Sequence, residues 1–536
     1  MTEKFSLKEL SKYKVGTWAD VIYRNALLHS DKEAFIYEDK RITFADYNAR
    51  INKMIRGLNQ MGVKKGDVLG ILSWSCLEFV EIYGLTMKAG FIASPFNPRL
   101  GADELEYLVK YSGTDTLFVG KELVDMANTL KSRLPQLKNL ISLETAAEGM
   151  KAYDDILKEN SGDEPDIDPD EDDPCCIIYT SGTTGVPRGA LYTQRRFIDD
   201  SRTLVIDMGL QEGHRRIQIT PLFHIAGNTH FRSSLYTVGS NTIVKFFDAA
   251  ETLKIIQREK ATHMDSVPTH LAAILNLPDL KQYDISSLEY FWYGGSPMPQ
   301  EVLKRGMEVF GPIFAQGFGQ SESGPAICHL SKEDHDVLDK PPKEQQKLAS
   351  TGRPDIGVQV RIVDDDGKDL GPDEVGEILV RSNHTMIEYW KKPEKTQETL
   401  VDGWLHTGDM GYYDEEGYIY IADRKKDMII SGGENVYPRE VEEVLYRHPA
   451  VLEAAVIGIP DEYWVEKVHA VIALKKGVEA TADDIKAFCK KNIAGYKTPK
   501  SIEFVAVLPK NAAGKILKRE LREKFWEGTP QEKKKS

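Results

Sequence analysis

The 536-residue sequence predicts an α/β fold in two parts of unequal size. Strand-type apolar runs alternate with helical patterns through the first half of the chain, and several runs end directly in Gly, Pro, Ser or Thr. Short β segments with DG and GP turns follow over residues 357–381. We expect a large multi-layer N-terminal domain over residues 1–423, with a small β subdomain, and a small α+β C-terminal lid domain over residues 424–536.

The N-terminal part begins with clear helix and strand signals. Thr43 and Asp46 have the spacing of a capping box, and apolar residues then recur at helical spacing. Residues 68–72 form a strand-type run, a helix is expected over residues 78–88, and a short strand follows at 91–94. This alternation is what predicts stacked α and β layers.

Farther along, four apolar stretches are each expected to be a strand that runs into a polar loop. They are Pro221–Asn228, 241–246, 263–268 and Tyr290–Pro299. Ligands of open α/β sheets collect at the carboxyl ends of strands, so these loops are expected to share one crevice. The lid is expected to contain a helix from Asp483 to Asn492 and a closing helix from Lys518 to Trp526.

Composition narrows the class of protein. A hydrophobic content of 41% and a charged content of 28% are those of a soluble globular enzyme. The net charge of -14 argues against a nucleic-acid partner and against an anionic membrane surface. Any phosphate-bearing ligand must therefore be held by local basic and N–H groups.

The cysteines and the apolar segments predict a cytoplasmic protein without a transmembrane segment. Five cysteines show neither C-x-x-C pairing nor zinc spacing, which favours a reducing compartment and no structural metal. The charged N-terminus has no signal-peptide pattern, and the most apolar region, residues 68–95, is interrupted by Glu78, Glu81 and Lys88. The sequence leaves the oligomeric state open, a homodimer included.

The stretch Tyr179–Leu191 reads YTSGTTGVPRGAL and follows the strand-type run CCIIY. Its glycines allow backbone N–H groups to turn toward an anion, and its hydroxyls and arginine add further donors. The residues expected to bind the anion are Thr180, Ser181, Gly182, Thr183, Thr184, Gly185 and Arg188. The spacing is not that of a Walker A loop. On the residues alone, a phosphate or polyphosphate site is favoured over a polar surface turn.

This stretch resembles the signature loop of the adenylate-forming superfamily, which includes acyl-CoA synthetases, peptide-synthetase adenylation domains and beetle luciferases. The superfamily usually has lysine where this chain has Arg188, a difference that keeps the charge and changes the donor geometry. Further stretches match the superfamily over nearly the whole chain. The resemblance implies a role for particular residues in each of these stretches. Without the resemblance, each of these residues could equally be a surface charge or a core side chain.

Two of these stretches resemble the nucleotide-contacting motifs of the superfamily. In GFGQSESG, Glu322 resembles the glutamate that binds Mg²⁺, and Ser321 retains the hydroxyl that contacts phosphate. Phe318 and Gly319 belong to the same motif. In YGGSPMP, the segment Gly295, Ser296 and Pro297 resembles the loop against which the adenine lies.

Three further stretches resemble the ribose contacts and the catalytic lysine. Asp409 in HTGD and Arg424 in DRKKD resemble the two residues that hold the ribose. Lys515 in PKNAAGKILKREL resembles the lysine that bridges the substrate carboxylate and the α-phosphate. An ammonium group and Mg²⁺ at that point offset the repulsion between two approaching anions.

The last two stretches concern the acyl and thiol substrates. His224 in PLFHIAGN resembles the histidine beside the acyl pocket; its alternative is a core histidine. Gly432 and Gly433 in SGGEN resemble the loop along the pantetheine tunnel, where a side chain would obstruct the thiol.

The resemblance implies an AMP-forming carboxylate–CoA ligase that uses ATP, Mg²⁺ and CoA. It would convert a carboxylic acid to acyl-AMP and then to acyl-CoA, releasing pyrophosphate and AMP. The residues expected near the pocket are largely apolar and aromatic, which favours an apolar aliphatic, cyclic or aromatic acid: Phe223, His224, Asn228, Thr229, Trp292, Tyr293, Gly317 and Phe318. A luciferase-like oxygenase and a ligase that acylates a carrier protein are the alternatives. A non-catalytic nucleotide-binding module would be expected to lack Glu322 or Lys515.

Overall fold

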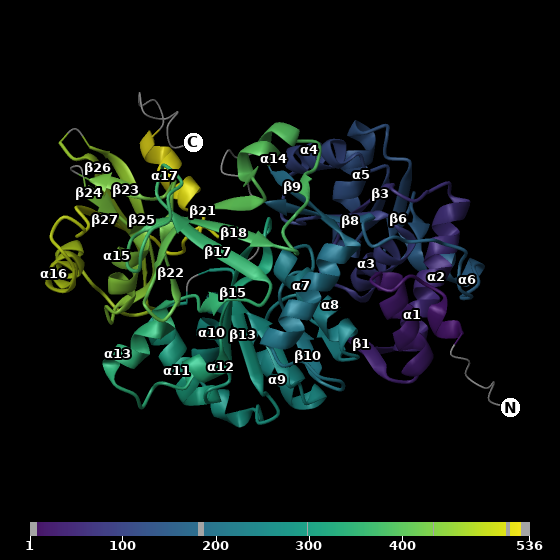
Figure 1. Ribbon diagram of the computed structural model, residues 1–536, viewed down its shortest axis with the longest axis horizontal. Coiled ribbons are helices and arrows are strands. Elements are labelled where there is room, and N and C mark those ends of the chain that lie inside the picture. Colours follow the sequence, from purple (N-terminus) through teal and green to yellow (C-terminus); the bar gives the residue numbers. More distant parts are fainter. Residues whose placement is uncertain are drawn as a thin grey trace.

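The computed structural model describes residues 8–180, 187–296, 298–431, 434–461, 463–510 and 515–526. The chain forms two large sheets, a smaller β sheet and a C-terminal α+β unit (Figure 1). The α/β architecture with a large N-terminal and a small C-terminal part confirms the predicted fold class. None of the helices among these residues combines the length and the apolar character needed to cross a membrane.

The first large sheet is parallel in its centre and carries the predicted phosphate loop. Its strands are, in spatial order, β19 (Glu388–Tyr389), β9 (Arg188–Thr193), β8 (Pro174–Thr180), β4 (Ile92–Phe96), β3 (Val68–Leu72), β5 (Thr116–Val119), β6 (Asn139–Ser142) and β7 (Lys151–Ala152). The strands β8 and β9 form an antiparallel hairpin, and β19 extends it on the far side of β9.

The second large sheet carries the Glu322 loop. Its strands are β16 (Arg353–Pro354), β15 (Gly324–Leu330), β14 (Phe314–Gln320), β13 (Tyr290–Gly294), β12 (His263–Ser266), β10 (Arg215–Gln218), β11 (Ser240–Ile243), β1 (Glu33–Tyr37) and β2 (Lys40–Thr43). The run from β14 to β1 is parallel, so the carboxyl ends of these strands lie at one edge, as the sequence predicted.

Helices fill the layer between these two sheets and cover their outer faces. Helix α3 (Leu77–Ala89) contacts β4 and β8 of one sheet and β1 of the other, and α7 (Gln194–Asp207) contacts β9 and β15. The remaining long helices of this part are α1 (Trp18–Leu28), α2 (Phe44–Gln60), α4 (Ala102–Ser112), α5 (Val124–Arg133), α6 (Tyr153–Glu159), α8 (Ile225–Tyr236), α9 (Ala249–Glu259), α10 (Pro268–Leu275) and α11 (Gln300–Phe310). The predicted capping box of Thr43 and Asp46 begins α2.

The predicted strand at Pro221–Asn228 is wrong. Residues 219–224 form a loop, His224 is the N-cap of α8, and the strand lies upstream at β10. The reason is that β10 contains Arg215 and Arg216, which hide its buried character in the sequence. The Arg216 side chain is buried and pairs with the equally buried Asp265 at 3.5 Å.

The smaller sheet follows, in green in Figure 1. It contains β17 (Val358–Val363), β18 (Gly376–Ser382), β20 (Leu400–Val401), β21 (Trp404–Tyr413) and β22 (Ile419–Arg424), all antiparallel. The subdomain predicted at 357–381 therefore extends to the end of β22. The short helix α14 (Pro393–Thr399) joins β19 to β20.

The C-terminal unit, yellow-green to yellow in Figure 1, has its own sheet and core. Its strands are β23 (Ile429–Ser431), β24 (Glu434–Val436), β25 (Val451–Asp461), β26 (Val465–Leu474) and β27 (Ser501–Phe504), and its helices are α15 (Pro438–Tyr446), α16 (Ala482–Asn492) and α17 (Lys518–Trp526). The last two agree with the predicted helices. The proposed boundary at 423/424 falls at the end of β22. Close to it, the Arg439 guanidinium of the C-terminal unit donates a hydrogen bond of 2.9 Å to the backbone oxygen of Ile421 on β22.

Candidate functional site

The ends of the predicted phosphate loop lie on the β8–β9 hairpin. Thr180 and Arg188 are directly opposite in the antiparallel register. Five predicted phosphate contacts lie outside the described residues: Ser181, Gly182, Thr183, Thr184 and Gly185. The Arg188 guanidinium lies 5.5 Å from the centre of the Tyr389 ring, a cation–π contact that holds it on the hairpin. Arg188 therefore lies beside the neighbouring strand β19.

Tyr389 also connects this hairpin to Glu322. Its hydroxyl donates a hydrogen bond of 2.8 Å to Oε1 of Glu322, in the loop between β14 and β15. Burial raises the pKa of the Glu322 carboxyl, and the Tyr389 hydroxyl opposes that effect because it stabilises the ionised form. A carboxylate oriented by one donor is the kind of oxygen ligand that Mg²⁺ takes together with phosphate oxygens, so Glu322 fits the predicted metal role.

The backbone of the Glu322 loop is fixed from β9. The Tyr192 hydroxyl donates to the carbonyl oxygen of Ser321 at 2.6 Å and accepts from the amide of Gly324 at 3.0 Å. A Cβ atom at Gly319 would lie 2.3 Å from the Gly324 oxygen, so only glycine fits there. Phe318 packs against the main core. The glycines of this motif thus serve the tight β14–β15 turn.

The predicted ribose pair is present as an ion pair across β21 and β22. Arg424 Nε lies 2.9 Å from Oδ1 of Asp409, and the two residues are opposite in the strand register. The amide of Gln320 donates to the other oxygen, Oδ2, at 2.6 Å. Each carboxylate oxygen has two acceptor positions, so Asp409 can still accept hydroxyl groups of a ribose.

Lys515 and His224 come to this same region from opposite parts of the chain. The pKa of Lys515 is lowered to about 8, first because the Arg424 guanidinium is nearby and second because the amine is buried. Burial lowers the pKa of His224 to about 4, and the positive charge of Lys515 contributes. The C-terminal unit therefore brings the predicted catalytic lysine near the Asp409–Arg424 pair and near His224.

His224 has a structural role that the sequence analysis did not consider. Its ring Nδ1 accepts a hydrogen bond of 3.3 Å from the amide of Ala226 and so caps α8. Since Nδ1 is an acceptor, the neutral ring carries its proton on Nε2. His224 is thus oriented by its own helix.

The predicted adenine loop begins where β13 ends. Gly295 has a φ of 77°, in the left-handed region, and Ser296 is half-buried. Pro297 and the two tunnel glycines, Gly432 and Gly433, lie outside the described residues. The structure therefore describes the start of the adenine loop only.

The side chains of β13 alternate between two faces. A Cβ atom at Gly317 would lie 1.9 Å from Cζ2 of Trp292, so the indole lies directly on this glycine. The ring of Trp292 is backed by His329, stacked at 5.2 Å. Tyr293, by contrast, belongs to another hydrophobic cluster and hydrogen-bonds His335 at 2.9 Å. Of the two predicted pocket aromatics on β13, Trp292 and Tyr293, only Trp292 faces Gly317.

Sequence reasoning missed two residues of the site, Tyr389 and Gln320. Gln320 lies inside the GFGQSESG motif, so its position was visible although its partner was not. Tyr389 follows Glu322 by 67 residues, and no local pattern marks it.

Comparison with known proteins gives the family. A model described as "AMP-binding enzyme" matches residues 22–390, and one described as "AMP-binding enzyme C-terminal domain" matches residues 440–515. The chain belongs to the AMP-binding enzyme family. This membership confirms the resemblance to the AMP-forming acyl-CoA synthetases, with ATP, Mg²⁺ and CoA as the ligands of that type.

The relatives of this AMP-binding enzyme cover nearly its whole length. A feruloyl-CoA synthase of Amycolatopsis sp is 34% identical over 513 residues, which span 95% of this chain and 99% of the relative. A long-chain-fatty-acid–CoA ligase of Bacillus subtilis (strain 168) is 35% identical over 538 residues, covering 95% and 94%. The crystal structure of the anthranilate CoA ligase AuaEII in complex with anthranoyl-AMP superposes with a TM-score of 0.88 at 29% identity, covering 97% and 99%.

Proposed function

We propose that this ligase activates an apolar carboxylic acid, aliphatic, cyclic or aromatic, and that the acyl-AMP forms between Glu322, Asp409, Arg424, Lys515 and His224. The observation that carries this proposal is the Asp409–Arg424 ion pair at 2.9 Å, to which Lys515 is electrostatically coupled, as it is to His224. Lys515, Arg424 and His224 come from the lid, the smaller sheet and the N-terminus of α8, and a shared ligand site explains why these groups converge.

Each residue of the proposed site has its own role in adenylation. Asp409 and Arg424 hold the ribose, with Gln320 fixing the carboxylate from the other side. Glu322 is the ligand of Mg²⁺, which when bound supplies charge compensation at the phosphates. Lys515, protonated below a pKa of about 8, places its ammonium where the substrate carboxylate meets the α-phosphate. Arg188, next to Tyr389, is placed to bind the outer phosphates.

Bringing an anionic acid to ATP is the difficult part of the reaction. The electrostatic repulsion falls when a positive group lies on the oxygens that gain charge in the transition state, and such groups typically accelerate a step by about 10²–10³-fold. AMP is a better leaving group than hydroxide, so the CoA thiol can then displace it. In that half-reaction Gly432 and Gly433 are proposed to line the thiol tunnel.

The proposed substrate class rests on the wall formed by Trp292. The indole lies on Gly317, its ring is stacked on His329 at 5.2 Å, and the surrounding cluster is largely apolar. Such a wall desolvates an apolar acyl group at little cost, whereas a polar acyl group would lose its hydrogen bonds to water. The named relatives act on aromatic and on long-chain acids, so both stay within the proposal.

The test is pyrophosphate and AMP release with a panel of aliphatic and aromatic acids of increasing size, with and without CoA. We expect turnover with apolar acids, and AMP release in multiple turnovers only with CoA. Preference for small polar acids would contradict the substrate class. Sustained turnover without CoA would point to the oxygenase alternative, and transfer to a phosphopantetheinyl carrier protein in preference to CoA would point to the carrier-protein alternative.

We also propose a cytoplasmic location. All five cysteines are free and buried, as expected of a chain that folds and acts in a reducing compartment. Fractionation of the source cells with an antibody against the chain tests this, and recovery from an oxidising compartment would contradict it.

A further inference from the structure

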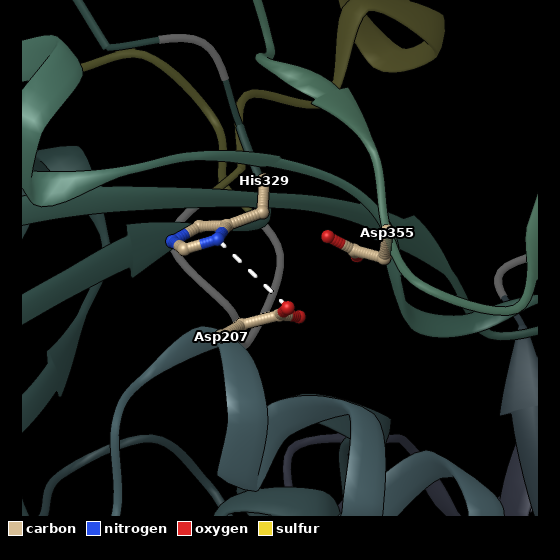
Figure 2. Close-up of side chains that lie close together, drawn as sticks. All are labelled: Asp207, His329 and Asp355. Carbon is tan, nitrogen blue, oxygen red and sulfur yellow. Dashed lines mark ion pairs between the residues drawn. The ribbon is translucent and has the colours of Figure 1, made fainter.

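Three chemistry-bearing side chains, Asp207, His329 and Asp355, meet outside the nucleotide site (Figure 2). Asp207 is the last residue of α7, His329 lies on β15, and Asp355 directly follows β16. One potential ligand atom from each lies within 4.8 Å of the others, and Nδ1 of His329 is 4.0 Å from Oδ1 of Asp207. In Figure 2 both carboxylates point toward the imidazole.

The hydrogen bonds around His329 determine which nitrogen faces the carboxylates. The Tyr290 hydroxyl donates its proton to the backbone oxygen of Asp207 at 3.0 Å, so it must accept from Nε2 of His329 at 3.2 Å. The Nδ1 lone pair therefore faces two carboxylates.

The carboxyl groups of Asp207 and Asp355 are buried next to each other and next to His329. Asp355 is 6% exposed, and its Oδ2 atom and that of Asp207 have no hydrogen-bond partner among the described residues. Among the residues that the structure describes, no lysine or arginine forms an ion pair with Asp207 or Asp355. The nearby Asp200 is already neutralised by Arg232 at 2.8 Å. Such a buried group is stabilised either by a proton that the two carboxyls share or by a cation bound between the three side chains.

We propose that Asp207, His329 and Asp355 bind a divalent transition-metal ion of the Zn²⁺ or Mn²⁺ type. One imidazole nitrogen and two carboxylate oxygens form a donor set for such ions, and metal–ligand distances of about 2.0–2.2 Å need only a small contraction of the present cluster. Mg²⁺ and Ca²⁺ prefer oxygen ligands throughout. Tyr290 supplies the outer hydrogen bond that orients a metal-binding histidine.

The ion would be structural. It would join the end of α7 to β15 and to Asp355, whose amide already binds the Ile327 oxygen of β15 at 3.1 Å. It would also fix His329, on which Trp292 is stacked. The site is separate from Glu322, so its occupancy is independent of ATP and of the Mg²⁺ that adenylation uses.

The experiment uses the untagged full-length chain, stripped with a chelator and free of ATP. Cobalt(II) is titrated in, its visible absorption is followed, bound metal is counted by mass spectrometry, and melting is recorded with and without Zn²⁺. We expect one cobalt per chain, displaced by Zn²⁺, and a higher Tm with either ion. An unchanged Tm together with no stoichiometric uptake would overturn the proposal in favour of a proton shared by the two carboxyls.

Variants separate binding from folding. Asp355→Asn and His329→Gln should each weaken cobalt binding by about 100-fold or more, and Tyr290→Phe by about tenfold. Without metal, Asp355→Asn should melt no lower than the stripped parent, because the amide removes the repulsion and offers Asp207 a donor. Glu322→Gln should still take up one cobalt. Parent-like cobalt affinity in both Asp355→Asn and His329→Gln would refute the assigned ligands.

Discussion

The hydrogen bond from Tyr389 to Glu322 gives the sharpest test of the nucleotide site. Tyr389→Phe removes one hydroxyl and keeps the ring, so the contact with Arg188 and the β19–β9 pairing persist. A hydrogen bond to a charged group contributes about 1.5–3 kcal/mol. Because Glu322 is only half-buried, we take the lower end of that range.

A loss of about 1.5 kcal/mol corresponds to an apparent affinity for Mg²⁺ in adenylation that is about tenfold weaker. The same change raises the pKa of Glu322, since Tyr389 stabilises the ionised carboxyl. At about 1.4 kcal/mol per pH unit, the shift is about one unit. Only the ionised carboxylate binds the metal, so the acidic limb of the pH profile should move to higher pH by that amount.

The assay is acid-dependent exchange of pyrophosphate into ATP over a range of Mg²⁺ and pH. Tyr413→Phe is a matched control, because its hydroxyl binds the Leu370 backbone oxygen at 3.2 Å instead of a site residue. We expect this control to behave as the parent. If a folded Tyr389→Phe variant kept both the Mg²⁺ requirement and the acidic limb of the parent, the reasoning about Glu322 would be wrong.

Three further predictions concern the two half-reactions and the acyl pocket. Lys515→Ala should slow acyl-AMP formation by at least about 100-fold and spare thioester formation from supplied acyl-AMP; in the parent, adenylation should fall about tenfold per unit above pH 8, since the ammonium is lost there. Equal loss of both half-reactions would contradict this role. Gly433→Leu should do the reverse, blocking the CoA step with adenylation intact, and normal CoA turnover would remove the tunnel assignment. Trp292→Ala should shift selectivity toward bulkier acids by about tenfold or more, measured as a ratio of kcat/KM values, whereas an unchanged ratio would place the pocket elsewhere.

Much of the fold could be predicted from local patterns. The strand at residues 68–72 and the closing helix at 518–526 agree with the structure because apolar periodicity and terminal signals are local properties. The strand at Pro221–Asn228 was wrong for the opposite reason. The real strand is β10, which lies just upstream of the predicted one. It contains Arg216, and the burial of this side chain depends on Asp265, which lies on another strand.

The sequence by itself determined the family and led to the proposed chemistry of the nucleotide site, because its motifs present Glu322, Asp409, Arg424 and Lys515 in a recognisable order. Only the tertiary structure decided how these groups are held. Tyr389 reaches Glu322 through the pairing of β19 with β9, and Gln320 reaches Asp409 across 89 residues. The same holds for the cluster of Asp207, His329 and Asp355, which no spacing in the sequence could reveal. Sheet register and layer packing create such contacts between distant segments, and a local pattern carries no record of them.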